Sequence, residues 1–578
     1  MGPMRTTTTR IHGSAVVAAC VLLAAGHRAS AQYDPPPGYY DSATGAGVTL
    51  KDQLSAIMAN GHLQRSYGNF RDSAALSDQD PNNPANLLEV YNRASVPGVW
   101  NCPNGNCVWN REHVWPQSLQ PGEASNSSTG NLGDPHALRP ADPGINNARG
   151  NLPFGSFDTT GNHRSLGAFY FPGDVDKGDV ARHLFYSATR YQSLGLGLVD
   201  GIPSVNQMGD LQSLLRWNYT DPPDDFERRR NHVTYSSTLN PSFFTNNRNA
   251  YVDRPEFVWS VFGGGANDST LYVGPAPQAD GTSSVNVDLG RVIVGAVSVA
   301  EQAVALHKDG EAPTYYQITT AGDATSSVSG RYNAFDFDPQ SMDLDVGLAP
   351  PFDAAGPRSG TVIMDNLDVD GAAAGQGSLD GDDMVAIELG VVDPSQASFS
   401  DAVDQDILTI DFGTITDGNA ILTQALMVHN LETTSGFTAA LDVDAVNTGG
   451  DTAALYTDAA PFTGLAAGTG QAFTAMFDTA AIGAFSTQVV FNVSDEDIPG
   501  ATAGMPLTLN LTGEVVALCN ACDVNCDSLQ NGADVVEMVN VLVGAAAPCS
   551  TCAGDTSRNA LTDDADVESF VACLLTAP

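Results

Sequence analysis

The chain has 578 residues, with 67 Asp and Glu against 25 Lys and Arg, and a formal net charge of −42. This length exceeds what one hydrophobic core supports, so several domains are expected. Residues 32–270 hold 17 basic and 24 acidic side chains, a net charge of −7, whereas residues 271–578 hold 5 and 43, a net charge of −38. Because acidic surfaces repel nucleic acid, the second half is excluded as a polyanion-binding region, and any phosphate chemistry belongs to the first half.

Residues 1–31 have the features of a secretory signal peptide. Arg5 and Arg10 precede an apolar run from Ala15 to Ala25, and a small-residue cleavage site stands before Gln32. A membrane anchor is the alternative, but this run is too short to span a bilayer. With no other long apolar stretch, we expect a secreted, extracellular protein without a transmembrane segment.

Cysteine usage agrees with export. Of nine cysteines, Cys20 lies in the signal peptide, which leaves an even number for disulfides. Cys102 and Cys107 flank a Pro-Asn-Gly-Asn turn and are expected to form a disulfide. The remaining six lie at positions 519, 522, 526, 549, 552 and 573. A structural zinc site is the rival interpretation of the CxxC pairs.

Residues 32–262 are predicted to form one mixed α/β domain. Apolar residues recur at helical spacing in four segments. These segments are Thr49–Ser66, Lys177–Gln192, Met208–Trp217 and Pro223–Tyr235. Three glycines from Gly263 begin an expected linker, residues 263–284.

From residue 285 the composition changes to short β-type runs, and two stretches recur. Val285–Gly295 resembles Leu408–Gly418, and Thr361–Asn366 resembles Thr487–Asn492 at about the same offset. The repeat predicts tandem all-β, immunoglobulin-like sandwiches over residues 285–400 and 401–517.

Residues 518–578 contain two loops with oxygen-bearing side chains at positions 1, 3, 5, 9 and 12. The loop residues are Asp523, Asn525, Asp527, Asn531 and Asp534, then Asp555, Ser557, Asn559, Asp563 and Asp566. Calcium loops require this spacing because alternate residues turn toward the ion. The paired loops, each followed by an apolar helix, resemble a dockerin module. The resemblance implies a small α-helical module that binds Ca²⁺ and a cohesin-like protein partner.

The stretch Cys107–Gly155 gathers the residue types that phosphodiester chemistry requires. Glu112 and His113 are adjacent, and Asn146 and Arg149 follow a Pro-Gly break. Imidazole suits a base near neutral pH, carboxylate and amide oxygens suit Mg²⁺, and a guanidinium suits a phosphate. Each residue alone also has a structural explanation: a hydrogen-bonded core histidine, a polar turn, or an arginine that caps a helix.

The ordered blocks NREHVWP, DPHALRPAD and INNARGN in this stretch resemble the endonuclease I family of secreted and periplasmic nucleases. The resemblance implies a ββα-metal (His-Me finger) site on an α+β domain. It implies His113 as general base, with Glu112 and Asn146 holding a divalent metal such as Mg²⁺. It also implies catalytic roles for Arg149 at the phosphate and for His136, in the second strand, as a supporting residue.

We therefore expect a metal-dependent, largely non-specific endonuclease that leaves 5′-phosphate and 3′-hydroxyl ends. DNA is the expected substrate, with RNA possible, and Arg139 and Arg248 are the expected substrate-binding arginines. One alternative is a catalytically inactive nuclease fold that attaches to a surface or matrix. A second is a phosphodiesterase or phosphatase that acts on small molecules.

Overall fold

The structure is a computed structural model that describes residues 33–155, 158–370, 380–416, 420–516, 522–545, 553–557 and 561–576. The predicted signal peptide lies outside the described residues. One compact unit holds the N-terminal domain and most of the first strand-rich region, up to residue 388. The other holds the second strand-rich region and the C-terminal helices, together with residues 290–299 and 350–358.

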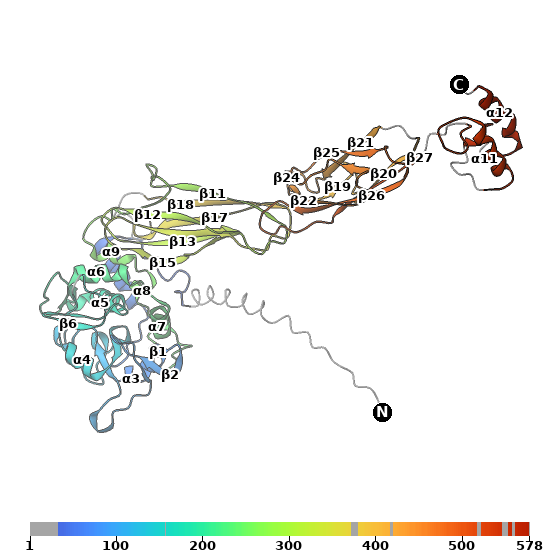
Figure 1. The fold of residues 1–578 in the computed structure, drawn as a ribbon. Coiled ribbons are helices and arrows are strands. Elements are labelled where there is room, and N and C mark those ends of the chain that lie inside the picture. The colour runs from blue at the N-terminus through green and yellow to red at the C-terminus, as the bar shows by residue number, and fades with distance from the viewer. Residues whose placement is uncertain are drawn as a thin grey trace, which may run out of the picture. The chain divides into compact units, whose positions relative to one another are not determined.

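The N-terminal domain, residues 33–262, packs helices and short strands around one main core (Figure 1). Its helices are α2 (Gly47–Ala59), α3 (Phe70–Ser77), α4 (Pro143–Arg149), α5 (Lys177–Arg190), α6 (Leu211–Thr220), α7 (Asp225–Tyr235), α8 (Ala250–Asp253) and α9 (Phe257–Phe262). Its strands are β1 (Gln79–Asp80), β2 (Asn83–Leu88), β3 (Ser95–Pro97), β4 (Asn110–His113), β5 (Leu138–Ala141), β6 (Arg164–Leu166), β7 (Phe169–Phe171), β8 (Gly197–Leu198) and β9 (Gln207–Met208). All four predicted helices are present, with shifted ends.

Helix α5 is the centre of this domain. Twelve consecutive residues, Gly178–Thr189, are buried, so the helix is covered all round rather than on one face. Helix α2 buries Leu50, Leu54 and Met58 against it, which is the apolar face expected from the sequence. The predicted helix over Thr49–Ser66 is too long, because it ends at Ala59 before Asn60 and Gly61.

Two regions of nine strands follow, and they have the same topology. The first contains β10 (Thr270–Val273), β11 (Ser284–Ile293), β12 (Gln302–Asp309), β13 (Thr314–Gly322), β14 (Ala324–Ser326), β15 (Gly330–Phe335), β16 (Gln340–Leu348), β17 (Gly356–Asn366) and β18 (Asp383–Val392). The second contains β19 (Ala397–Ser398), β20 (Ile407–Thr416), β21 (Ile421–Asn430), β22 (Leu441–Gly450), β23 (Leu455–Thr457), β24 (Phe462–Leu465), β25 (Thr469–Asp478), β26 (Gly483–Asp495) and β27 (Leu507–Val516).

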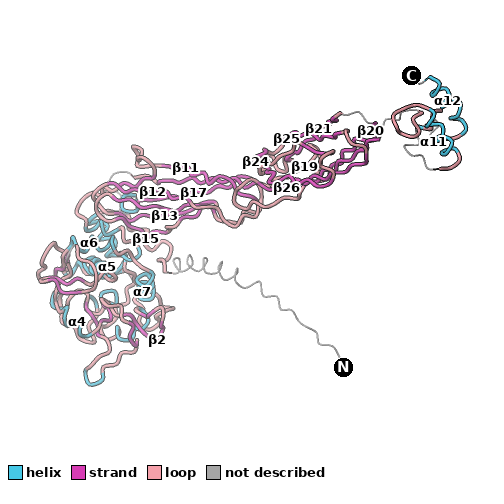
Figure 2. The backbone as a smooth tube through the Cα atoms, in the orientation of Figure 1, coloured by secondary structure: helices cyan, strands magenta, loops and turns pink. Residues whose placement is uncertain are grey.

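Each region is built from a four-stranded and a five-stranded sheet. Strands, drawn in magenta, make up most of both regions in Figure 2. The sheet orders are β10-β12-β16-β14 and β11-β18-β17-β13-β15 in the first, and β19-β21-β25-β23 and β20-β27-β26-β22-β24 in the second. Strand for strand these orders coincide, which confirms the predicted internal repeat. In the second region, apolar side chains of both sheets share one core, the arrangement of a β-sandwich.

The predicted linker 263–284 is wrong in part. Strand β10 falls inside it and pairs with β12 of the first sandwich. The sandwich also packs on the N-terminal domain: Tyr219 of α6, Tyr315 and Leu367 form a buried cluster. The Tyr219 hydroxyl donates to Asp368 Oδ1 at 2.7 Å. The three glycines from Gly263 therefore lie between two domains that pack against each other, and they do not form a flexible linker.

The C-terminal module contains α11 (Gly532–Leu542) and α12 (Val567–Thr576), which correspond to the two predicted helices. A Cys522–Cys573 disulfide joins its two halves. Both loops make the same bonds: Asp534 accepts from the amides of Asn525 and Asn531, and Asp566 from those of Ser557 and Asp563. The predicted ligand Asn559 lies outside the described residues.

Candidate active site

The antiparallel strands β4 and β5, followed by helix α4, form the predicted ββα unit. Asn110 pairs with Ala141, Glu112 with Arg139, and His113 with Leu138. Successive strand residues point to opposite faces, so Glu112 and His113 leave β4 in opposite directions. The predicted Cys102–Cys107 disulfide is present just before this strand.

His113 is held with one ring nitrogen engaged and the other available. Its Nε2 lies 3.0 Å from the Leu132 carbonyl oxygen, and its ring stacks on Tyr67 with centroids 4.7 Å apart. A carbonyl oxygen only accepts, so Nε2 carries the proton and the lone pair is on Nδ1. Within the described residues Nδ1 has no hydrogen-bond partner. Burial lowers the pKa of His113 to about 4, which keeps the ring neutral at pH 7.

Glu112 is 2% exposed, and one of its carboxylate oxygens is occupied. Oε1 accepts from the Tyr91 hydroxyl at 2.7 Å and from Arg149 Nη1 at 3.0 Å. Burial raises the pKa of Glu112, while Arg149 and the Tyr91 hydroxyl oppose that rise. In the described part of the chain Oε2 has no hydrogen-bond donor. It is an available hard oxygen ligand.

Asn146 lies in helix α4, one turn before Arg149. The Asp142 side chain accepts from the amides of Gly144 and Ile145, and Pro143 occupies the first helical position, so the helix start is strongly specified. Asn146 precedes Arg149 by three residues and shares its face of the helix, and Arg149 contacts Glu112. The half-buried Asn146 amide makes no hydrogen bond to a described side chain or backbone group. Carboxylate and amide oxygens are the kinds of ligand that Mg²⁺ takes while it keeps several waters.

Arg149 is not placed to clamp a phosphate. It is 1% exposed, and besides Glu112 its guanidinium donates to the carbonyl oxygens of His113 and Val114 at 3.1 and 2.8 Å. Every one of these partners belongs to β4 or its end. We therefore revise its predicted role from phosphate binding to positioning of the Glu112 carboxylate.

The predicted substrate-binding arginines are also buried. Arg139 is 0% exposed and bonds Asp78 at 2.9 Å and Asp179 at 3.0 Å. Arg248 is 0% exposed and bonds Asp253 at 2.7 Å. A buried guanidinium neutralised by carboxylates has no surface left for a polynucleotide, so both assignments are withdrawn.

His136 is likewise a structural residue in this arrangement. It lies in a 3-10 turn, Pro135–Ala137, just before β5 rather than in that strand. The ring is 1% exposed, with Nε2 3.0 Å from the Asn247 carbonyl oxygen. It braces the segment that carries β5 and has no access to a substrate.

Sequence reasoning missed four contacts of the site: Tyr91 on Glu112, Tyr67 and Leu132 on His113, and Asp142 at the start of α4. Only the last had a local signal, because Asp-Pro-Gly before a polar run is a helix start. Leu132 is 19 residues from His113 and Tyr91 is 21 residues from Glu112, Tyr67 is more distant still, and no periodicity relates these residues to β4.

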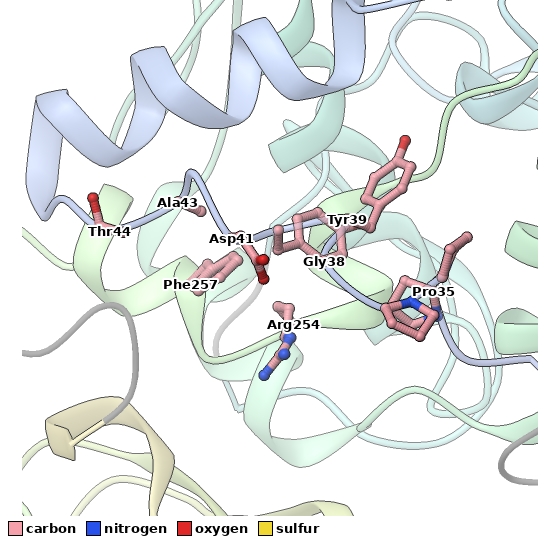
Figure 3. Close-up of a pocket in the computed structure, with 11 residues that line it drawn as sticks. Pro35, Gly38, Tyr39, Asp41, Ala43, Thr44, Arg254 and Phe257 are labelled. Atoms are coloured by element: carbon pink, nitrogen blue, oxygen red, sulfur yellow. The ribbon is translucent and has the colours of Figure 1, made fainter.

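A cavity of about 320 Å³ lies elsewhere in this domain (Figure 3). Its walls are the Pro35–Asp41 segment, Ala43, Thr44, Arg254 and Phe257. None of the candidate site residues lines it, so the candidate site is the β4–α4 surface and not this cavity.

We expect Arg149→Met to lower the free energy of unfolding by about 3 kcal/mol, because it leaves the buried Glu112 carboxylate without its counter-ion. Urea denaturation followed by tryptophan fluorescence measures the change. The double variant with Glu112→Gln should recover part of the loss, since no buried charge then remains. Equal stabilities of the single and double variants would contradict this account of Arg149.

In the described residues, no three His, Cys, Asp or Glu side chains are gathered as a metal site. The candidate metal ligands of the N-terminal domain are one carboxylate, Glu112, and one amide, Asn146, which is fewer than three such side chains. In the C-terminal loops, Asp534 and Asp566 are turned toward backbone amides of their own loops. No described helix is long and apolar enough to cross a membrane.

Residues 46–256 match the Endonuclease I family. An extracellular ribonuclease of Bacillus amyloliquefaciens is 38% identical over 241 residues, which are 39% of this chain and 78% of that protein. An extracellular ribonuclease of Bacillus subtilis (strain 168) is 38% identical over 246 residues, 40% of this chain and 81% of that protein. The family match covers the domain that holds β4, β5 and α4 and ends before the sandwiches.

Proposed function

We propose a mechanism for this chain on the premise that it belongs to the endonuclease I family and is a nuclease, a phosphodiester hydrolase. His113 acts as the general base on water, and Glu112 and Asn146 hold one divalent metal ion, Mg²⁺. The observation that carries the proposal is that three groups of the β4–α4 unit, His113 Nδ1, Glu112 Oε2 and the Asn146 side chain, make no hydrogen bond to a described residue. The alternative of an inactive attachment protein lacks support from this intact set.

In this mechanism Nδ1 of His113 takes the proton as water attacks phosphorus, and the Leu132 carbonyl stabilises the imidazolium through Nε2–H. Arg149 and Tyr91 hold Oε1 of the Glu112 carboxylate, which leaves Oε2 as the oxygen for the metal ion. A bound Mg²⁺ ion would neutralise charge on the phosphoryl and leaving oxygens. The leaving 3′ oxygen takes a proton from solvent water, which gives a 3′-hydroxyl and leaves the phosphate on the 5′ end.

The proposed substrates are DNA and RNA, cleaved outside the cell. The two named relatives are extracellular ribonucleases, which supports RNA beside the DNA expected from the family resemblance. The signal-like residues 1–31 support export.

Plasmid nicking and hydrolysis of a single-stranded RNA test the proposal. We expect both to require Mg²⁺, to stop with EDTA, and to recover when Mg²⁺ is added in excess. End-labelling with and without phosphatase distinguishes 5′-phosphate from 5′-hydroxyl products. Activity that survives exhaustive chelation would overturn the metal assignment, and cleavage of a small diester but no polymer would favour the small-molecule alternative.

For the C-terminal module we propose Ca²⁺ binding and docking to a cohesin-like partner. The matching bonds of Asp534 and Asp566 support two equivalent loops. Titration calorimetry of the full chain should show calcium binding that is reduced in Asp523→Ala combined with Asp555→Ala. Thermograms that are flat for the native chain would refute calcium binding by these loops.

A further inference from the structure

Most arginines close to the candidate site are neutralised by carboxylates, but two neighbouring ones are not. Arg149, Arg139 and Arg230 each pair with a buried Glu or Asp. Arg71, in α3, and Arg111, in β4, have no carboxylate within ion-pair distance in the part of the chain that the structure describes. In a chain of net charge −42, two adjacent uncompensated cations require an explanation.

The two guanidiniums share one neutral acceptor at the surface. Arg71 Nη2 donates to Asn126 Oδ1 at 2.9 Å, and Arg111 Nη1 lies 3.3 Å from the same oxygen. Arg111 Nη1 also donates to the Tyr67 carbonyl oxygen at 2.6 Å. These oxygens accept hydrogen bonds without cancelling charge. The Nη ends therefore keep their charge where solvent reaches them.

Aromatic rings hold both cations in place. The Arg111 guanidinium carbon lies 3.5 Å from the Tyr67 ring centroid and 5.3 Å from that of Trp100, and Arg71 lies 4.9 Å from Trp100. Trp100 in turn packs edge-on against buried Trp109, with centroids 4.7 Å apart. Such cation–π contacts fix a guanidinium without using its hydrogen-bond donors.

The row of stacked groups begins at the candidate base. The Tyr67 ring stacks on the His113 ring and also contacts the Arg111 guanidinium. Arg111 and His113 are two residues apart in β4 and so lie on the same face of the strand. The Cys102–Cys107 turn, whose flanking residues Asn101 and Val108 are hydrogen-bonded, brings Trp100 beside Trp109. The pair of cations is thus positioned at a fixed place next to the proposed cleavage site.

We propose that Arg71 and Arg111 bind a phosphate adjacent to the one that is cleaved, so that this site takes a polynucleotide strand rather than a small diester. Two forked donors with unused Nη–H groups match the oxygens of one phosphate. Tyr67, Trp100 and Asn126 are positioning residues for this pair. The inference rests on the proposed nuclease function and adds the polymer requirement to it.

The test compares kcat/KM for a single-stranded oligonucleotide with kcat/KM for bis(4-nitrophenyl) phosphate, which has only one phosphate. Arg71→Gln and Arg111→Gln should each lower kcat/KM for the oligonucleotide about tenfold, because each removes a charge-assisted hydrogen bond. Both variants should leave kcat/KM for bis(4-nitrophenyl) phosphate unchanged. The slope of log Kd against log [salt] should fall by about 0.7 for each phosphate that is no longer neutralised. Arg111→Lys should keep the salt slope but not the full affinity.

Arg229→Gln is the matched control, because Arg229 also bonds only neutral oxygens, those of Leu76 and Gln79. Arg229→Gln should change kcat/KM for neither substrate. Anisotropy of a labelled oligonucleotide in EDTA measures Kd independently of cleavage. If no polymer is cleaved but the Gln variants lose affinity, the proposed function fails and this site stands. If the Gln variants bind and cleave the polymer like Arg229→Gln, the phosphate site is refuted.

Discussion

His113→Ala lowers kcat/KM for polynucleotide cleavage by about 10²–10⁴-fold, the usual contribution of a general base. The expected loss is in kcat, since the imidazole acts on water and not on substrate affinity. His113 is also stacked on Tyr67, so a change in stability must be separated from a change in chemistry. Single-turnover cleavage at saturating enzyme, with the folded fraction measured in parallel, makes that separation.

His307 offers a matched control. It stacks on Tyr272 with ring centroids 4.9 Å apart, close to the geometry of His113 on Tyr67, but it lies on β12 in the first sandwich. His307→Ala should retain full activity. If His113→Ala were as active as His307→Ala, the base would have to be another group and the proposed mechanism would be wrong.

The acid limb of the pH profile is expected near pH 4 rather than near pH 6.5. The base works only when unprotonated, and burial lowers the pKa of His113 to about 4. The log of kcat/KM should therefore be flat from pH 8 to about pH 5 and fall below that. Because the folded pKa lies below the unfolded one, protonation also favours unfolding, and stability is lost as pH falls from about 6.5 to 4.

The family resemblance, which rests on motifs close together in the sequence, was enough to predict the ββα unit and to name its two proposed metal ligands. Glu112 and His113 are consecutive, Asn146 follows a helix start within the same stretch, and the Cys102–Cys107 turn is closed by a disulfide. The repeat of the sandwiches was also visible, because equivalent strands keep equivalent residues at a nearly constant offset. Each of these features depends on residues that are close in sequence or on a pattern that recurs.

The roles of the arginines could not be predicted in this way. Whether a guanidinium faces solvent or a buried carboxylate depends on partners elsewhere in the chain: Arg139 meets Asp78, 61 residues away. The same limitation hid Arg71 and Arg111, which are brought together only by folding. Composition indicated how many cations the domain has, and tertiary pairing decides which of them stay available to a substrate.

Tyr315→Ala, a change in the first sandwich, should lower the free energy of unfolding of the N-terminal domain by about 3 kcal/mol, the loss typical of a large buried aromatic side chain. Tyr315 is 0% exposed, contacts Tyr219 and Leu367, and donates its hydroxyl to the Asn218 carbonyl of α6. Without the ring, α6 loses apolar cover and a buried carbonyl loses its donor. The sandwich would thus act as part of the domain's core.

All five tryptophans of the chain lie in the N-terminal domain, at positions 100, 109, 115, 217 and 259. Tryptophan fluorescence therefore reports unfolding of this domain in the intact chain, with no need to isolate it. Tyr456→Ala, in the second sandwich, is the control and should leave the transition in place. An unchanged transition in Tyr315→Ala would mean that the first sandwich is only tethered to the domain. The first sandwich spans 130 residues, 263–392, and carries none of the chemistry of the active site. A shift would mean that the folded active site nevertheless depends on this sandwich.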